Sequence, residues 1–251
     1  PVVDVIKKKF TGYVVEERIL SAADYGVPQD RKRIIFLGYK KGVKACKFPI
    51  QTHKKEQLTV LDAIKDLLKV SPTIDGKITI RDTYSSSQGA EFRKRMRNWE
   101  CVRQNGEVVK SKGGKKTSHW TRSVNDRDKV LFQYIKSGAT SYSKGKLSIE
   151  TSVPRQIYGD IYPDMWNLHL APAFKKAGLS AWKRDGRHHI KNKEGKRWLM
   201  YSTKGFKDKM RRIRWDKPSP TIVAHLAKDG YMFIHPVEDR TITVREAARF
   251  Q

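Results

Sequence analysis

The sequence has little cysteine and no long apolar run. Only Cys46 and Cys101 occur among its 251 residues, without the Cys-x-x-Cys spacing of zinc sites. Two such distant cysteines exclude a disulfide framework and a zinc knuckle. There is no run of about 18 apolar residues, no signal-peptide pattern and no long basic amphipathic helix, so we expect a soluble, cytoplasmic protein without a membrane partner.

Acidic residues are scarce as well. Against 53 Lys and Arg there are only 26 Asp and Glu, which gives a net charge of +27 and a pI of about 10.1. Hydrophobic residues still make up 38% and aromatic residues 10%, a composition that excludes a disordered basic tail. A foldable chain with this excess of cations attracts polyanions, and nucleic acid is the usual one.

The first 70 residues carry the clearest periodicity. Residues 2–6 have the apolar spacing of a helix, and residues 13–20 alternate in polarity as a strand does. Residues 33–39 form a β-branched and aromatic run that predicts a buried strand. Thr59 and Asp62 have the spacing of a capping box and predict a helix that continues to about residue 68.

The rest of the chain differs in composition and periodicity. Residues 75–205 consist mainly of loops rich in Lys, Arg, Gly and Ser, with a helix predicted from Asn125. Residues 218–225 and 230–234 predict two strands around an Asp-Gly turn, and Thr243 with Glu246 forms a second capping box. These elements together predict a mixed α/β fold.

Two arginines and a glutamine precede the predicted buried strand. At strand spacing, Gln29, Arg31 and Arg33 point the same way, so two guanidiniums and an amide converge on one face. Guanidiniums suit phosphate oxygens and carbonyl edges, whereas an amide both donates and accepts. By local pattern alone, a solvated strand start is the simpler interpretation.

The sequence around these residues favours a functional role for Gln29, Arg31 and Arg33. Residues 25–38, with Gln29-x-Arg31-x-Arg33 before a core strand, resemble the eighth sequence motif of the DNA cytosine-5 methyltransferases. Residues 241–251 are similar to the ninth motif of that family, and residues 220–231 resemble the segment that precedes it. We expect the two motif segments to be two edges of one interrupted fold.

The resemblance implies a domain plan. It implies the end of a Rossmann-like catalytic domain over residues 1–70, a target recognition domain over 71–210 and the ninth-motif segment over 211–251, cut short. Its implied partner is double-stranded DNA. The implied reaction flips a cytosine out of the duplex and methylates its C5 from S-adenosylmethionine, after a cysteine thiolate adds to C6. Arg31 and Arg33 would support this chemistry near the target base, with Gln29 behind them, whereas Arg245 and Glu246 would be structural.

The sequence also departs from the family pattern. It has no Pro-Cys dipeptide, no Glu-Asn-Val triplet and no Gly-rich cofactor loop. We therefore expect a C-terminal part that binds no cofactor and is inactive alone, and that requires an N-terminal catalytic half from the same gene or a separate chain. The resemblance implies a prokaryotic restriction–modification system.

Basic clusters in the middle region are the expected DNA contacts. Clustered cations supply affinity through phosphates, while a few side chains read base edges. The histidine pair at 188–189 lacks further ligands at metal spacing, so we expect no metal site. Besides Gln29, Arg31 and Arg33, the expected DNA-binding residues are Arg93, Lys94, Arg95, Arg97, Lys110, Lys112, Lys115, Lys116, Arg187, His188, Lys191, Lys193, Lys196 and Arg197.

Two alternatives come from other classes. Pro163-Asp164 with Glu194-x-Lys196 satisfies the Pro-Asp…Glu-x-Lys pattern of Mg²⁺-dependent nucleases, but this pattern is short and Glu194 falls in a predicted turn. A non-enzymatic nucleic-acid binder would explain the charge but not the ordered flanking motifs. A preference for one short cytosine-containing duplex would separate the methyltransferase interpretation from the generic binder.

Overall fold

The computed structural model has a mixed α/β fold built from short elements. It describes residues 2–68, 70–73, 78–79, 88–97, 100–102, 108–110, 115–116, 118–135, 137–138, 170–185, 187–199, 210–226, 228 and 230–251. Within these ranges no helix combines the length and the apolar character needed to cross a bilayer.

Most of the described helices and strands are short. The helices are α1 (Val2–Lys9), α2 (Val60–Ile64), α3 (Gln88–Arg97), α4 (Asp126–Gln133), α6 (Ala171–Lys176) and α7 (Val244–Arg249), with 3-10 turns η1 (Ala22–Tyr25), η2 (Lys65–Leu67) and η5 (Gly230–Phe233). The strands are β1 (Tyr13–Ser21), β2 (Gln29–Asp30), β3 (Lys32–Lys40), β4 (Ile78–Thr79), β5 (Glu100–Val102), β6 (Val108–Lys110), β7 (Lys115–Lys116), β8 (Ser180–Arg184), β9 (Arg187–Lys191), β10 (Arg197–Leu199) and β11 (Ser219–Pro220).

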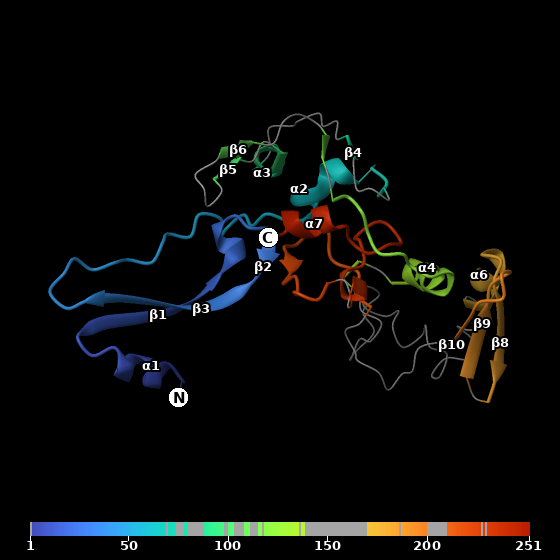
Figure 1. Ribbon diagram of the computed structural model, residues 1–251, viewed down its shortest axis with the longest axis horizontal. Helices are drawn as coiled ribbons and strands as arrows, with labels where there is room; N and C mark the ends of the chain where they lie inside the picture. Colours follow the sequence, from blue (N-terminus) through green and yellow to red (C-terminus); the bar gives the residue numbers. More distant parts are fainter. Residues whose placement is uncertain are drawn as a thin grey trace.

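The elements are arranged as a centre with two arms. Figure 1 shows α2, α7 and β2 in the middle, the antiparallel pair β1 and β3 extending to one side with α1, and the sheet β10–β9–β8 with α6 on the other side. The first and last parts of the chain therefore meet in the centre, because β2 and α7 both lie there.

The pair β1 and β3 confirms both strands that the sequence predicts near the N-terminal end. The register runs from Tyr13 opposite Lys40 to Ser21 opposite Lys32. The prediction that the second strand is buried is wrong for the described part of the chain, since Ile34 and Ile35 are 46% and 42% exposed. Nothing in that part adds a third strand to the pair.

Two apolar clusters hold the centre and the second arm. The central cluster joins residues of α2, such as Ile64, to residues from the last 40 positions, such as Phe233 and Phe250. The second cluster joins α4 to α6 and β9 through Phe132, Phe174 and Ile190. The last 40 residues contribute to both clusters, because Ile234 packs in the second one.

The capping box predicted at the start of α2 is confirmed. The Thr59 hydroxyl accepts a hydrogen bond from the backbone N–H of Asp62 at 3.2 Å, and the Asp62 carboxylate accepts one from the Thr59 backbone at 3.0 Å. Ala63, Ile64 and Leu67 are fully buried. The cap therefore fixes the start of the helix that carries the central core.

Removal of this cap provides a first test of the fold. We expect Thr59→Ala to lower the free energy of unfolding by about 1 kcal/mol, since an N-cap hydroxyl contributes about 0.5–2 kcal/mol. Urea unfolding followed by circular dichroism measures the change. Thr52→Ala is a matched control, because the Thr52 hydroxyl contacts only the neighbouring His53 ring at an exposed position; an equal loss in both variants would contradict the capping role.

The hairpin predicted over residues 218–234 is wrong. Among the described residues of this range, strand structure is limited to Ser219 and Pro220, and residues Gly230–Phe233 form the 3-10 turn η5. Proline lacks the N–H that a central strand must donate, and two prolines stand at 218 and 220. Ile234 instead forms one isolated β-bridge with Arg212 and another with Thr241.

Candidate nucleic-acid interface

The site begins where two distant segments of the chain lie side by side. Strands β2 and β11 pair in parallel, with Ser219 opposite Gln29. The Gln29 side-chain amide donates to the Phe250 carbonyl at 3.3 Å, and the Thr221 hydroxyl donates to the Asp30 carbonyl at 3.0 Å. The two segments therefore lie side by side, as expected for two edges of one fold.

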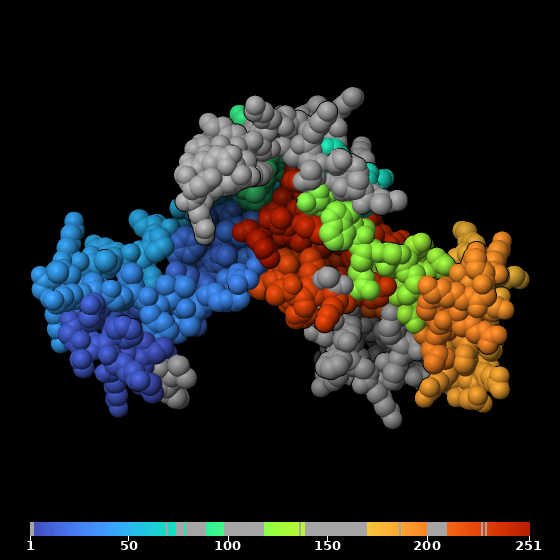
Figure 2. Space-filling model, in the orientation of Figure 1, coloured from blue at the N-terminus to red at the C-terminus, as the bar shows by residue number. Residues whose placement is uncertain are grey.

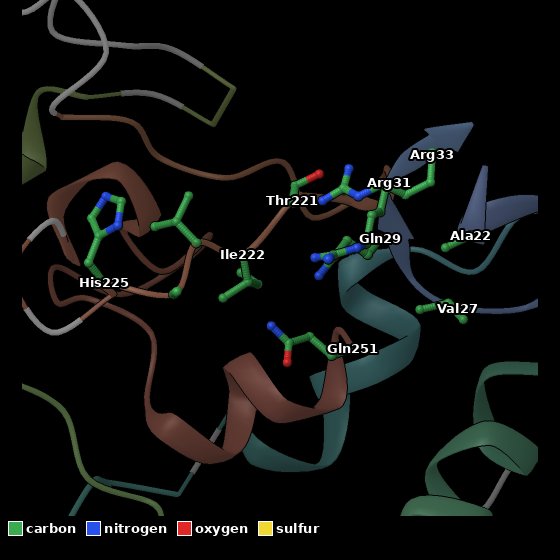
Figure 3. Close-up of a pocket in the computed structure, with 11 residues that line it drawn as sticks. Ala22, Val27, Gln29, Arg31, Arg33, Thr221, Ile222, His225 and Gln251 are labelled. Carbon is green, nitrogen blue, oxygen red and sulfur yellow. The ribbon is translucent and has the colours of Figure 1, made fainter. Parts of the chain in front are cut away.

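These segments enclose a cavity of about 760 Å³. This volume lies within the range of about 300–1,000 Å³ that small-molecule sites span. Figure 3 shows Arg31 and Gln29 beside Thr221, with Arg33 and His225 at opposite ends of the view and Gln251 below. The lining residues are Ala22, Val27, Gln29, Arg31, Arg33, Thr221, Ile222, Val223, Ala224, His225 and Gln251.

The charge of this cavity selects an anionic ligand. None of the described residues that line it is acidic, whereas Arg31 and Arg33 bring two guanidiniums. Guanidiniums form charge-assisted hydrogen bonds with phosphate oxygens and carbonyl groups. A half-buried arginine and an exposed arginine beside an amide and a hydroxyl therefore suit a nucleotide better than a cationic or apolar ligand.

A turn held by Asp24 connects the two lining residues Ala22 and Val27. The Asp24 carboxylate accepts hydrogen bonds from the amides of Gln51 at 3.0 Å and Gln57 at 2.7 Å, and its carbonyl accepts the His53 N–H. Gly26 has a φ of +85°, and a Cβ there would lie 2.8 Å from the His53 ring. A side chain at this position would be strained by the left-handed backbone and would press on the His53 ring, so the turn requires glycine.

Helix α7 is held by a cap at its own start and by hydrogen bonds to residues 118–120 and Arg240. The Thr243 hydroxyl accepts from the Glu246 N–H at 3.1 Å, as the capping box predicts. The backbone N–H groups of Val244 and Arg245 donate to the carbonyls of Trp120 and Ser118. The structural role expected for Glu246 is confirmed, since its buried carboxylate binds Arg240 at 2.8 Å.

Three of the expected DNA contacts are buried instead. Arg93 and Arg97 are 3% and 6% exposed, and His188 is 7% exposed. Arg93 donates to the Asp62 carbonyl at 2.8 Å, and Arg97 pairs with the Asp66 carboxylate at 3.3 Å. Arg93 and Arg97 therefore hold α3 against α2, and their burial speaks against the expected contact of these two side chains with DNA.

Gln29 is also more buried than expected. It is 1% exposed, and its amide is bound to the Phe250 carbonyl. Gln29 lines the cavity as part of its wall, so it cannot reach an outer phosphate. Lys94 and Arg95, by contrast, are exposed on α3.

The sheet β10–β9–β8 and its turns carry the basic residues expected between positions 187 and 197. Trp182 stacks on His189 with ring centroids 5.4 Å apart, and the Lys196 ammonium lies 5.7 Å from the Trp198 ring. Trp198 packs on the second apolar cluster, which supports the sheet. Of the expected contacts on this sheet and its turns, Lys191 is half-buried and the exposed ones are Arg187, Lys193, Lys196 and Arg197.

The two arms lie at opposite ends of the molecule. Figure 2 shows the arm of β1 and β3 on one side and the sheet β8–β10 on the other, with residues from the first and last parts of the chain meeting between them. The sheet that carries the exposed cations is thus separated from the arm of β1 and β3 by the centre of the molecule.

Some predicted residues cannot be placed. Lys112 and Asp164 lie outside the described residues, and for Lys110, Lys115 and Lys116 only the backbone strands β6 and β7 are described. Glu194 and Lys196 are exposed after β9. In the part of the chain that the structure describes, no three His, Cys, Asp or Glu side chains are placed to hold a metal ion.

Sequence reasoning missed part of the cavity wall. Thr221, Ile222, His225 and Gln251 line it, although the sequence marked them only by resemblance and not as site residues. It also missed Arg212, which is buried and donates to the carbonyls of Ile135 and His235 at 2.6 and 2.7 Å. No local sequence pattern marks an arginine that will be buried. Only the contacts of Arg212 in the structure show that it links these segments.

Comparison with known proteins identifies the family. The model of the C-5 cytosine-specific DNA methylases matches residues 2–251. The chain is 28% identical to M.OihORF3336P, a type II methyltransferase of Oceanobacillus iheyensis, over 96% of this chain and 54% of that protein. It is 27% identical to the type II methyltransferase M.AgeI of Thalassovita gelatinovora, over 98% of this chain and 59% of the relative.

A third relative extends the same relationship. The chain is 28% identical to the type II methyltransferase M.Bpa9945I of Bacillus paralicheniformis, over 98% of this chain and 47% of the relative. The chain therefore spans about half the length of these curated relatives. Since the family model covers almost every residue, the chain belongs to the C-5 cytosine-specific DNA methylase family.

Proposed function

We propose that this chain is the DNA-recognising part of a DNA cytosine-5 methyltransferase of a type II restriction–modification system. With an N-terminal catalytic half it would transfer a methyl group from S-adenosylmethionine to cytosine C5. The family match and the names of its relatives support this proposal. The observation that carries it is the cavity to which Arg31, Arg33 and Thr221 contribute from two distant segments.

The cavity is proposed to receive the target nucleotide. A base must leave the duplex before an enzyme reaches its ring, and it then enters a fitted pocket. Arg31 is half-buried and Arg33 is exposed, so one guanidinium can face the base while the other reaches the flanking phosphate. Gln29 forms the wall behind them, held by the Phe250 carbonyl.

The second arm is proposed to bind the duplex beside the cavity. Exposed Arg187, Lys193, Lys196 and Arg197 lie on one small sheet and its turns. Cations neutralise phosphates and release counterions, which supplies affinity without sequence information. We propose the boundaries 71–210 for this recognition region, with residues 1–70 and 211–251 forming the floor around the target base.

The described cavity does not fit the methyl donor itself. S-adenosylmethionine carries a sulfonium, an ammonium and one carboxylate and is therefore a net cation, yet the charged lining residues are two arginines and none of the described lining residues is acidic. Like charges disfavour such a ligand here. We therefore assign the cofactor and the nucleophilic cysteine to the proposed N-terminal half, and no step at this cavity passes through the cofactor.

The test is selection of duplexes from a random pool, followed by binding measurements on the selected one. We expect the 251-residue chain to enrich one short cytosine-containing sequence. Arg31→Ala with Arg33→Ala should lower affinity for it by about 10- to 100-fold, since a hydrogen bond to a charged group contributes about 1.5–3 kcal/mol. Fluorescence anisotropy at fixed salt measures the change.

Lys32→Ala is the matched control. Lys32 lies between the two arginines and is exposed, but it is not a cavity residue. We expect its loss to weaken binding by less than about threefold, because it removes only a general electrostatic contribution. Equal losses in the two variants, or equal affinity for every duplex and for RNA, would favour a generic nucleic-acid binder and overturn the proposal.

A further inference from the structure

The chain passes between the two apolar clusters at two neighbouring places. Met210 packs in the second cluster, which supports the sheet β8–β10, whereas Ile213 packs in the central cluster. Phe233 and Ile234 divide in the same way, with Phe233 in the central cluster and Ile234 in the second. The two places are joined, because Arg212 forms a parallel β-bridge with Ile234. Residues 210–213 and 233–234 therefore form a junction between the centre and the second arm.

The side chain of Arg212 is buried at this junction and binds groups on both sides of it. Its exposed fraction is 5%. Towards the second arm, its Nε donates to the Ile135 carbonyl at 2.6 Å and its Nη2 donates to the Phe132 carbonyl at 2.7 Å. Towards the centre, its Nη1 donates to the carbonyls of His235 and Glu238 at 2.7 and 2.8 Å. One guanidinium thus holds backbone groups from both sides of the junction together.

The groups that Arg212 binds suit a rigid donor with several N–H groups. Phe132 lies in the last turn of α4, and the last four carbonyls of a helix have no partner within the helix. A cation at this end also interacts favourably with the helix dipole. Arginine presents five N–H donors in fixed directions, whereas a lysine ammonium is a point charge on a flexible stem. Arginine therefore fixes the angle between α4 and the segment that precedes α7.

Helix α4 transmits this constraint to the sheet β8–β10. Phe132 of α4 packs with Phe174 of α6 and Ile190 of β9 in the second cluster. That sheet and its turns carry the exposed cations proposed to bind the duplex, and Figure 1 shows the sheet beyond α4 and α6, away from the centre. On the other side of the junction the chain continues into α7 and ends at Gln251, which lines the cavity. The contacts of Arg212 therefore set where the sheet lies relative to the cavity.

We propose that Arg212 is a positioning residue for sequence recognition, which holds the sheet β8–β10 at a fixed distance and angle from the cavity. The inference rests on the proposed function, because it assigns a role in recognition of the same duplex. Since Arg212 is buried, it acts through the groups that it holds. Hydrogen bonds to base edges weaken steeply when a donor shifts, whereas general attraction to phosphates depends less on direction. Loss of Arg212 therefore costs selectivity more than general affinity.

The first experiment measures the affinity of Arg212→Lys for two duplexes. This variant keeps the charge but loses the fork of donors, so we expect its affinity for the selected duplex to fall at least about 10-fold. Its affinity for an unselected duplex of the same length should stay within about twofold, because the exposed cations remain. Fluorescence anisotropy at fixed salt measures both affinities. An equal loss for both duplexes, which is the result of partial unfolding, overturns the proposal.

Asp239→Ala is a milder variant with a matched control. The Asp239 carboxylate binds the Arg212 guanidinium at 2.6 Å and is 39% exposed, so we expect selectivity to fall by about three- to fivefold. In the control Asp216→Ala, the lost carboxylate binds Arg214 at 2.6 Å and is 44% exposed, but Arg214 is itself 50% exposed. Both variants remove one negative charge. Equal selectivity in the two overturns the proposal, and this comparison decides it where Arg212→Lys does not fold.

A distance measurement without DNA separates this proposal from the proposed function. Spin labels are placed on Ile19→Cys in β1, where the side chain is 71% exposed, and on Ser180→Cys, which is exposed in β8. Cys46→Ser and Cys101→Ser remove the other thiols. Electron–electron double resonance then reports the distance between the two arms. We expect one narrow distribution of distances in this labelled chain.

The width of this distribution is the decisive readout. It should increase in Arg212→Lys and in Asp239→Ala but not in Asp216→Ala, with far-ultraviolet circular dichroism confirming that each variant remains folded. Equal widths in all variants overturn the proposal. A broader distribution in a chain that selects no duplex would count against the proposed function, and it would leave the control of the second arm by Arg212 intact.

Discussion

Replacement of Asp66 by asparagine is expected to lower the free energy of unfolding by about 3–5 kcal/mol, the cost of removing one partner from a buried ion pair. The Asp66 side chain is fully buried and accepts hydrogen bonds from both terminal nitrogens of the Arg249 guanidinium, one of them at 3.0 Å. It also pairs with Arg97 at 3.3 Å. The variant therefore leaves two buried guanidiniums without their shared counter-charge.

This loss would be a large fraction of the stability of a typical domain, which is about 5–15 kcal/mol. Urea unfolding at pH 7.5 followed by tryptophan fluorescence measures it. Asp185→Asn is the control, because the Asp185 side chain is 86% exposed in its pair with Arg184; its effect should stay within about 0.5 kcal/mol. A loss below about 1 kcal/mol in Asp66→Asn would show that the carboxylate does not hold α3 and α7 on α2.

The second large effect is a loss of stability in mild acid. Burial lowers the pKa of His235 to about 4, although the Glu246 carboxylate opposes this change. The ring is fully buried, and its Nδ1 accepts the N–H of Glu238 at 2.9 Å. Protonation would place a second proton on a ring that burial shields from solvent.

The direction of the pH dependence follows from this lowered pKa. Because the folded protein binds the proton less readily than the unfolded chain, the contribution of His235 is complete above about pH 6.5 and declines as the pH falls towards 4. Each pH unit within this window removes about 1.4 kcal/mol, so the loss between pH 6.5 and pH 5 is about 2 kcal/mol. Burial also lowers the pKa of His119, which adds a loss of the same sign.

His235→Asn is the matching variant. The asparagine oxygen can take the place of Nδ1 as acceptor for the Glu238 N–H, but the side chain does not titrate. Unfolding free energies at pH 7.5, 6.5, 5.5 and 5.0 should fall more gently for the variant than for the wild type, with the remaining slope due to His119. Measurements at pH 5 and higher avoid the titration of Glu246: burial opposes the ionised form, but Arg240 and His235 lower its pKa. Parallel curves for both proteins would contradict the assignment to His235.

Local patterns predicted the elements that local interactions build. The capping boxes at Thr59 and Thr243 form as their spacing indicates, because a cap involves only four consecutive residues. The strand alternation that places Arg31 and Arg33 on one side is equally local, and both residues line the cavity. The predicted hairpin over residues 218–234 failed, since prolines at 218 and 220 limit strand pairing there.

No local sequence pattern separated the buried basic residues of α3 from the exposed ones. Arg93 and Arg97 have the same sequence texture as Lys94 and Arg95, yet the first two are buried against α2 and the other two are exposed. Which side of a basic helix turns inward depends on the carbonyl and carboxylate groups that another element brings to it. Here those groups are the Asp62 carbonyl and the Asp66 carboxylate.

The amino-acid sequence by itself determined the excess of cations, the helix starts and the guanidinium pair, because charge, caps and strand alternation depend on residues close together in the chain. The tertiary structure alone decided that Thr221 and Gln251 complete the cavity and that Asp66 binds Arg249 across more than 180 positions. It also decided that both faces of β1 and β3 lie open in the described residues. Contacts between distant segments depend on how whole elements pack, and packing is a property of the folded chain.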